Sequence, residues 1–97
     1  MDKHEEELKN LRLEIDGLDK LLLTTLRNRF RLVDKISRVK KKLGLPAHQQ
    51  ARWDTMLKSR FQFADRLKLD QAFTHSFFKI IHRESKRIQI AKLKGNK

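Results

Sequence analysis

The stretch LRLEIDGLDKLLLTTLRNRFRLVDKISRVK, residues 11–40, decides the fold of this chain. Its apolar side chains recur every seven residues in two rows, the first of which begins just before the stretch, at Leu8. That period is typical of a long helix whose apolar stripe packs on another helix. The stripe is polar only near its middle, at Thr25 and Arg29. The pattern therefore predicts one long helix over about residues 5–42.

Turn signals divide the rest of the chain into two shorter helices. Gly44 and Pro46 end the first helix and precede a second over about residues 47–66. Asp70 is a residue type that caps helix N-termini, and it opens a third helix over about residues 70–92. We expect an all-α fold of one long and two shorter helices.

The length of the first helix bears on assembly. About 35 helical residues extend roughly 50 Å, whereas a compact domain of this size is only about 33 Å across. The first helix therefore extends past any core that its own chain can build. A second copy would cover the remaining stripe, so we predict a single domain over residues 1–97 that forms an intertwined helical homodimer.

Composition limits the possible functions. The 97 residues carry 24 Lys and Arg against 12 Asp and Glu, a net charge of +12. That excess favours an anionic partner, either nucleic acid or a small polyanionic metabolite. The chain has no Cys, which excludes disulfides and thiolate chemistry. The absence of a long apolar run and the polar N-terminus predict a cytoplasmic protein with no membrane partner.

Two cations share the apolar line of the first helix. Arg29 and Lys40 are eleven residues apart, which on a helix leaves an angle of about 20° between them. Such a pair is costly among apolar side chains unless an anion meets it. Arg12 points about 100° away from Arg29, so it could serve the same kind of pocket only in a partner chain. Taken singly, each of these cations could also be a solvated surface residue.

Taken in order, these residues resemble a known family. Residues 11–40 are similar to the opening helix of the all-helical chorismate mutases, with its pattern LRxxIDxLDxxLLxLLxxRxxL and a Lys eleven residues after the last Arg. GLP at residues 44–46 precedes a helix with an Arg in its first turn. FFKIIHRESKRIQ at residues 77–89 resembles the closing helix, IHxxSxxxQ. The resemblance covers about residues 8–90.

The resemblance implies an enzyme that rearranges chorismate to prephenate on the route to phenylalanine and tyrosine. In a homodimer with two sites, Arg12 would enter the site of the partner, and Lys40 and Gln89 would meet the ether oxygen of the substrate. The carboxylate-binding residues implied by the family are Arg12, Arg29, Arg52 and Ser85. A unimolecular rearrangement needs positioning and electrostatic stabilisation. The resemblance therefore implies no metal and no cofactor.

The second helix departs from the commonest family pattern at two positions. Gln49 and Trp53 stand where an Asp and a Glu are usual, and an indole N–H cannot accept the ring hydroxyl of the substrate. The carbonyl of Gln49 could accept it. Relatives of this fold rearrange 4-amino-4-deoxychorismate or eliminate pyruvate from isochorismate. Ser85 and Gln89 favour the plain mutase.

A basic helical nucleic-acid-binding module is the alternative from a different class. The net charge and the Lys and Arg clusters support it. No nucleic-acid motif is present, however, and such a module has no reason to place Arg29 in an apolar stripe. The four His show no metal-ligand spacing. We therefore expect no nucleic acid and no metal, and leave open a regulatory partner protein.

Overall fold

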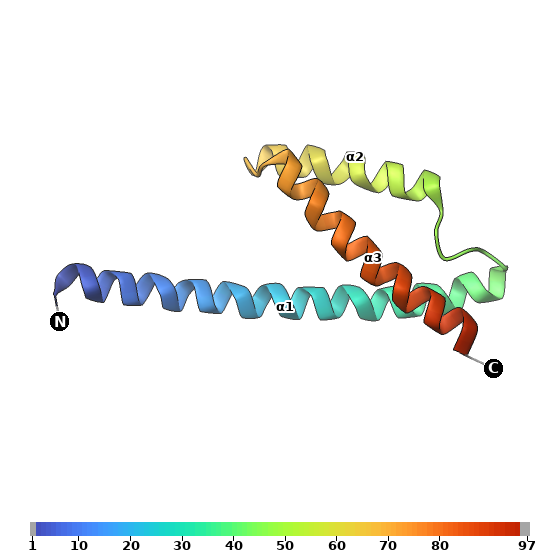
Figure 1. The fold of residues 1–97 in the computed structure, drawn as a ribbon, viewed down its shortest axis with the longest axis horizontal. Coiled ribbons are helices and arrows are strands. Elements are labelled where there is room, and N and C mark those ends of the chain that lie inside the picture. Colours follow the sequence, from blue (N-terminus) through green and yellow to red (C-terminus); the bar gives the residue numbers. More distant parts are fainter. Residues whose placement is uncertain (1, 96–97) are drawn as a thin grey trace. The chain divides into compact units, whose positions relative to one another are not determined.

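The computed structural model describes residues 2–95, and this part of the chain contains three helices and no strand. They are α1, Lys3–Leu43; α2, Gln50–Arg66; and α3, Gln71–Gly95 (Figure 1). The predicted all-α fold of three helices is confirmed. The chain divides into two compact units, Met1–Leu32 and Val33–Lys97.

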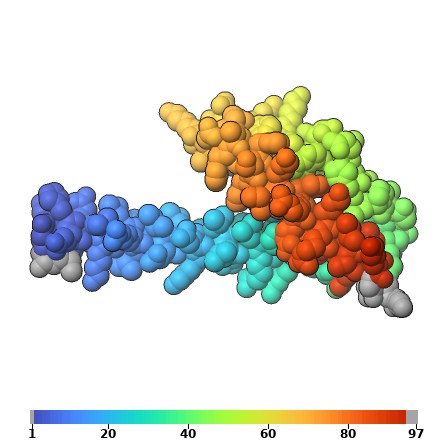
Figure 2. Space-filling view, viewed as in Figure 1, coloured from blue at the N-terminus to red at the C-terminus, as the bar shows by residue number. Residues whose placement is uncertain are grey.

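The first unit is the N-terminal part of α1, a single helix wide in the space-filling view (blue to cyan, Figure 2). Its helical residues 3–32 extend over about 45 Å. The unit holds no second element, and its apolar side chains are 47–64% exposed at the stripe positions Leu8, Leu11, Ile15, Leu18 and Leu22. A stripe of this size on a free helix is an interaction surface, because water-exposed apolar area is unfavourable.

The second unit contains the last turns of α1 together with α2 and α3. The chain reverses direction at the short turn that joins α2 to α3, and the two helices diverge from that turn (Figure 1). The buried apolar side chains are Val33, Met56, Ala64 and Ile81. An equal number of polar side chains is buried: Ser37, Thr74, Ser85 and Gln89. With so small an apolar core, directional polar contacts have a large share in setting how the helices pack.

Gly44 ends α1 in a left-handed conformation, with φ of +68°. The N–H of Gly44 donates to the Lys41 carbonyl at 3.2 Å, and the N–H of Leu45 donates to the Lys40 carbonyl at 2.9 Å. These two bonds form a Schellman motif, which satisfies carbonyls that the helix end would leave unpaired. Glycine suits this position because it has no Cβ to clash at positive φ.

The turn between α2 and α3 repeats the same motif with a different residue. Lys68 has φ of 59°, and the N–H groups of Lys68 and Leu69 donate to carbonyls of the last α2 turn at 3.0 and 2.9 Å. Asp70 then caps α3, its carboxylate accepting from the Phe73 N–H at 2.8 Å. The predicted N-cap is confirmed. Among the described residues, no helix is long and apolar enough to cross a membrane.

Candidate functional site

Lys40 and Gln89 form the centre of the candidate site. The Nζ of Lys40, in the last turn of α1, donates to Oε1 of Gln89 on α3 at 2.8 Å and to the carbonyl of Ala47 at 2.7 Å. Gln89 is buried and Lys40 is half-buried. Two residues far apart in sequence are thus held in one polar contact, which joins α1, α3 and the segment between α1 and α2.

The segment after α1 is bound to Lys40 twice. The Lys40 carbonyl accepts from the N–H of Leu45, and the Lys40 ammonium donates to the carbonyl of Ala47. This use of the Ala47 carbonyl accounts for a difference from the sequence prediction. The second helix begins at Gln50 and not at residue 47, because the carbonyl of Ala47 accepts from Lys40 before the helix starts.

The electrostatics of this centre favour an anion. Burial lowers the pKa of the Lys40 ammonium, and the positive charge of Arg52 lowers the pKa further. Both causes disfavour the charged form of the lysine. A bound anion would relieve the repulsion between Lys40 and Arg52, so the site is suited to a negatively charged ligand.

Three more residues singled out from the sequence, Gln49, Arg52 and Trp53, lie at the start of α2. Gln49 occupies the N-cap position in an extended conformation, and its carbonyl accepts from the N–H of Trp53 at 3.1 Å. Arg52 is exposed, whereas Gln49 and Trp53 are half-buried. The indole of Trp53 lies against the imidazole of His82, with ring centroids 4.1 Å apart and 32° between the rings.

A histidine pair links the segment before α2 to α3, and sequence reasoning missed it. Nδ1 of His48 lies 3.1 Å from Nε2 of His82, and Nε2 of His48 lies 3.0 Å from Oε1 of Gln50. Gln50 in turn donates to Asp54 at 2.9 Å. One signal could have found His82: it precedes Gln89 by seven residues, so both lie on one face of α3.

The remaining predicted residues fall in both units. Ser85 is buried on α3, one turn before Gln89. Arg12 is exposed and Arg29 is half-buried, and both belong to the unit Met1–Leu32. The structure thus joins Lys40 to Gln89 directly, and the roles of all these residues in binding and catalysis stay predictions. Within residues 2–95 there is no group of three or more His, Asp or Glu that could hold a metal ion.

Comparison with known proteins adds independent information. Residues 11–90 match the family described as chorismate mutase type II. A 4-amino-4-deoxychorismate mutase from Streptomyces venezuelae is 33% identical over 85 residues, which cover 88% of this chain and 82% of that protein. The T-protein of Enterobacter agglomerans is 37% identical over 79 residues, and that of Haemophilus influenzae is 34% identical over 80. These matches cover 81% and 82% of this chain but only 21% of each T-protein.

Proposed function

Because the chain belongs to the chorismate mutase type II family, we propose that it is a chorismate mutase that converts chorismate to prephenate for aromatic amino acid biosynthesis. The observation that carries the proposal is the contact of Lys40 with Gln89 at 2.8 Å. It places an ammonium and an amide side by side in a part of the molecule that favours anions.

The reaction explains why two hydrogen-bond donors can serve the bond-breaking step. In this rearrangement a C–O ether bond breaks while a C–C bond forms, so no proton is transferred and no nucleophile is needed. Negative charge grows on the ether oxygen in the transition state. Donors aimed at that oxygen stabilise the transition state more than the substrate, which is the condition for raising kcat.

Lys40 and Gln89 each keep a hydrogen-bond donor that can reach the ether oxygen. An ammonium has three N–H groups, and Lys40 uses two of them, on Ala47 and Gln89. The third is available for the ether oxygen. Since the Oε1 of Gln89 accepts from Lys40, the amide presents Nε2 as its donor. Both groups therefore donate to one acceptor, with Lys40 orienting the amide.

The substrate carboxylates require further cations. We assign them to Arg29 and Arg52 and to Arg12 of the partner subunit, with Ser85 as an additional donor. Guanidinium groups suit this role because their planar fork binds a carboxylate through two parallel hydrogen bonds. Holding a flexible dianion in its reactive conformation contributes to the rate through proximity and orientation.

The homodimer is the second part of the proposal. The exposed stripe of residues 8–22 finds a partner when two copies pack their α1 helices together, so that residues 1–97 form one domain within an intertwined dimer. Its support is the 47–64% exposure of five large apolar side chains on one helix. A net charge of +12 leaves the surface able to attract a dianionic substrate.

Turnover of chorismate tests the proposal. The wild-type protein should consume chorismate, measured as a loss of chorismate absorbance, and yield prephenate. The product is identified by its ¹H NMR spectrum, because prephenate has the same mass as chorismate. Isochorismate and 4-amino-4-deoxychorismate, assayed in parallel, test whether Gln49 and Trp53 redirect ring selectivity. The absence of turnover with chorismate, together with turnover of one of the other two, would replace the proposal with that related activity.

A further inference from the structure

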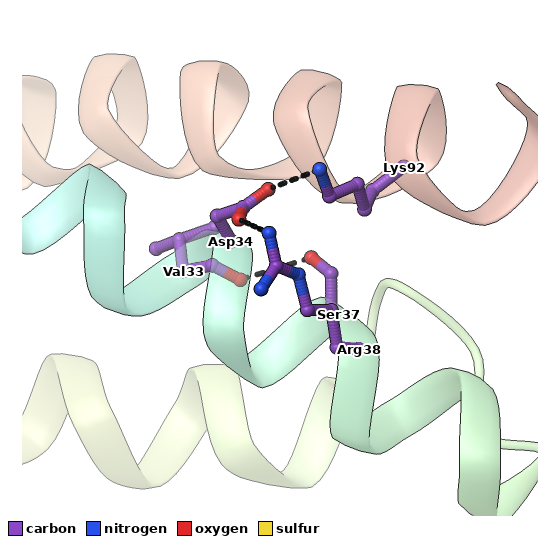
Figure 3. Close-up of polar contacts among 5 residues, drawn as sticks. All are labelled: Val33, Asp34, Ser37, Arg38 and Lys92. Carbon is purple, nitrogen blue, oxygen red and sulfur yellow. Dashed lines mark hydrogen bonds and ion pairs between the residues drawn. The ribbon is translucent and has the colours of Figure 1, made fainter. Parts of the chain in front are cut away.

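We infer that Asp34 and Lys92 are positioning residues for this reaction: their ion pair fixes α3 against α1 so that Gln89 meets Lys40. Figure 3 shows the contact, in which the ammonium of Lys92 on α3 reaches Asp34 on α1. The Nζ–Oδ1 distance is 3.2 Å, and both side chains are 30% exposed. The inference rests on the proposed function for its kinetic consequences only.

The carboxylate of Asp34 serves two cations, one from each helix. Its second oxygen, Oδ2, lies 3.1 Å from the guanidinium of Arg38, one turn along α1 (Figure 3). That second pair lies within a single helix and cannot hold α3. The chain thus offers a matched control: Arg38 and Lys92 bind the same carboxylate, but only Lys92 belongs to α3.

The Asp34–Lys92 pair and the Lys40–Gln89 contact are two separate links between the same helices. Along α1 the linked residues are six positions, or about 9 Å, apart, and along α3 they are three positions, or about 4.5 Å, apart. One such link to α1 does not by itself set both the rotation of α3 and its position along α1. Two links at different heights set both its rotation and its position along α1.

Few side chains of α1 are buried in this unit, so apolar packing gives little to set the register of α3 on α1. On this part of α1 the buried side chains are Val33 and Ser37. Ser37 is fully buried, but its Oγ donates to the Val33 carbonyl in its own helix at 2.9 Å, so it makes that bond within α1 (Figure 3). Apolar packing is non-directional, whereas a charge pair with defined geometry can specify one arrangement among several of similar stability.

The position of Lys92 makes its effect on Gln89 direct. Lys92 follows Gln89 by three residues, so the two side chains lie on neighbouring positions of one helix face. When the Lys92 contact is lost, the turn that carries Gln89 loses its second support. Misplacing a catalytic group by about 1 Å can lower a rate by as much as 10²-fold. Partial loss of this support should lower kcat by about tenfold.

The kinetic test compares Lys92→Met with Arg38→Gln. Lys92→Met should lower kcat about tenfold and change KM less than twofold. The reason is that the variant misplaces the Gln89 amide, which donates to the transition state, and not the groups that bind the substrate carboxylates. Arg38→Gln should leave both near wild type, and Lys92→Arg should restore kcat. In a Gln89→Ala background Lys92→Met should cause no further loss, since residues that act through one another are not additive. An equal tenfold loss in that background would overturn the inference.

A readout that does not depend on turnover separates this inference from the proposed function. The side-chain ¹H–¹⁵N resonances of the Gln89 amide should shift in Lys92→Met and in Asp34→Asn, but not in Arg38→Gln. An unmoved Gln89 amide in both variants would overturn the inference whatever the activity. If the wild type fails to convert chorismate while the amide shifts as expected, the proposed function falls and the positioning role stands.

Discussion

The Lys40 ammonium on α1 and the Gln89 amide on α3 are hydrogen-bond partners 49 positions apart in sequence, with 2.8 Å between Nζ and Oε1. The bond fixes the direction of the amide, because only its oxygen can accept from an ammonium. The amide nitrogen is therefore presented on the opposite side, where it can donate to a ligand.

Replacing the amide by a carboxylate removes the donor while the shape is kept. In Gln89→Glu the ionised side chain still pairs with Lys40 but has no N–H, so kcat near pH 7.5 should fall by about 10²–10³. Protonation at acidic pH restores an O–H donor, so the activity of the variant should rise as the pH is lowered. A pH series of kcat for the variant and the wild type measures this, and a variant insensitive to acid would contradict the assigned orientation.

Because the pKa of Lys40 is lowered, activity and stability should change in opposite directions as the pH rises. Burial, and then the charge of Arg52, lower this pKa below the ordinary value of 10.5. As the pH rises through the lowered pKa the ammonium is lost, so kcat/KM should fall at a pH below 10.5. In the same window the unfolded chain binds more protons than the folded one, so the free energy of unfolding should rise with pH.

The Arg52→Gln variant isolates the second cause of the shift. Removing that charge should move the titration of the Lys40 ammonium to higher pH, although burial still holds it below 10.5. The ¹⁵N chemical shift of the Lys40 ammonium against pH reports this directly. A titration at or above 10.5 in the wild type would show that the ammonium is not desolvated.

The ends of α1 and α2 have the same motif, so substitutions at their left-handed residues can be compared for their effect on stability. Gly44 and Lys68 occupy equivalent left-handed positions, at φ of 68° and 59°. Apart from the adjacent residues, no described atom lies within 4 Å of where a Cβ at Gly44 would lie, so the backbone conformation is the main obstacle to a side chain there. Gly44→Ala should therefore lower the free energy of unfolding by about 1 kcal/mol. Lys68→Gly should raise it by about 0.5–1 kcal/mol. Urea unfolding of both variants measures the difference, and equal signs would contradict this account.

The dimer proposal predicts complementation between inactive chains. Arg12→Ala and Lys40→Ala should each abolish activity, because each site needs Lys40 of one chain and Arg12 of the other. In a heterodimer of the two variants, one site has both residues intact and the other has neither. Subunit exchange should therefore restore up to about one quarter of the wild-type activity, from half the dimers with one working site each. A mixture that stays inactive after verified exchange would place Arg12 outside the partner's site.

Local signals in the sequence were enough to predict the helices. Gly44 and Asp70 mark helix ends because their roles depend on backbone conformation and on bonds within a few residues. The start of α2 was predicted too early, at residue 47. The carbonyl of Ala47 is bound by Lys40, a contact set by a side chain seven residues away that a local pattern does not contain.

The site could be predicted only in part. The resemblance named Lys40 and Gln89, which the structure joins, but it could not supply the contacts around them. The pairs His48–His82 and Asp34–Lys92 each link segments far apart in sequence, and each residue alone is an ordinary polar side chain. Such pairs follow from the packing of the helices, which periodicity does not specify.

The most direct test of the central claim is the rate of prephenate formation by the wild type and by Lys40→Met at saturating chorismate. The wild type should convert chorismate to prephenate. The Lys40→Met variant should remain folded and lower kcat by about 10²–10³, because the donor to the ether oxygen is lost. Turnover by Lys40→Met at the wild-type rate would contradict the assignment of Lys40 to the transition state, and no turnover by the wild type would contradict the proposed function itself.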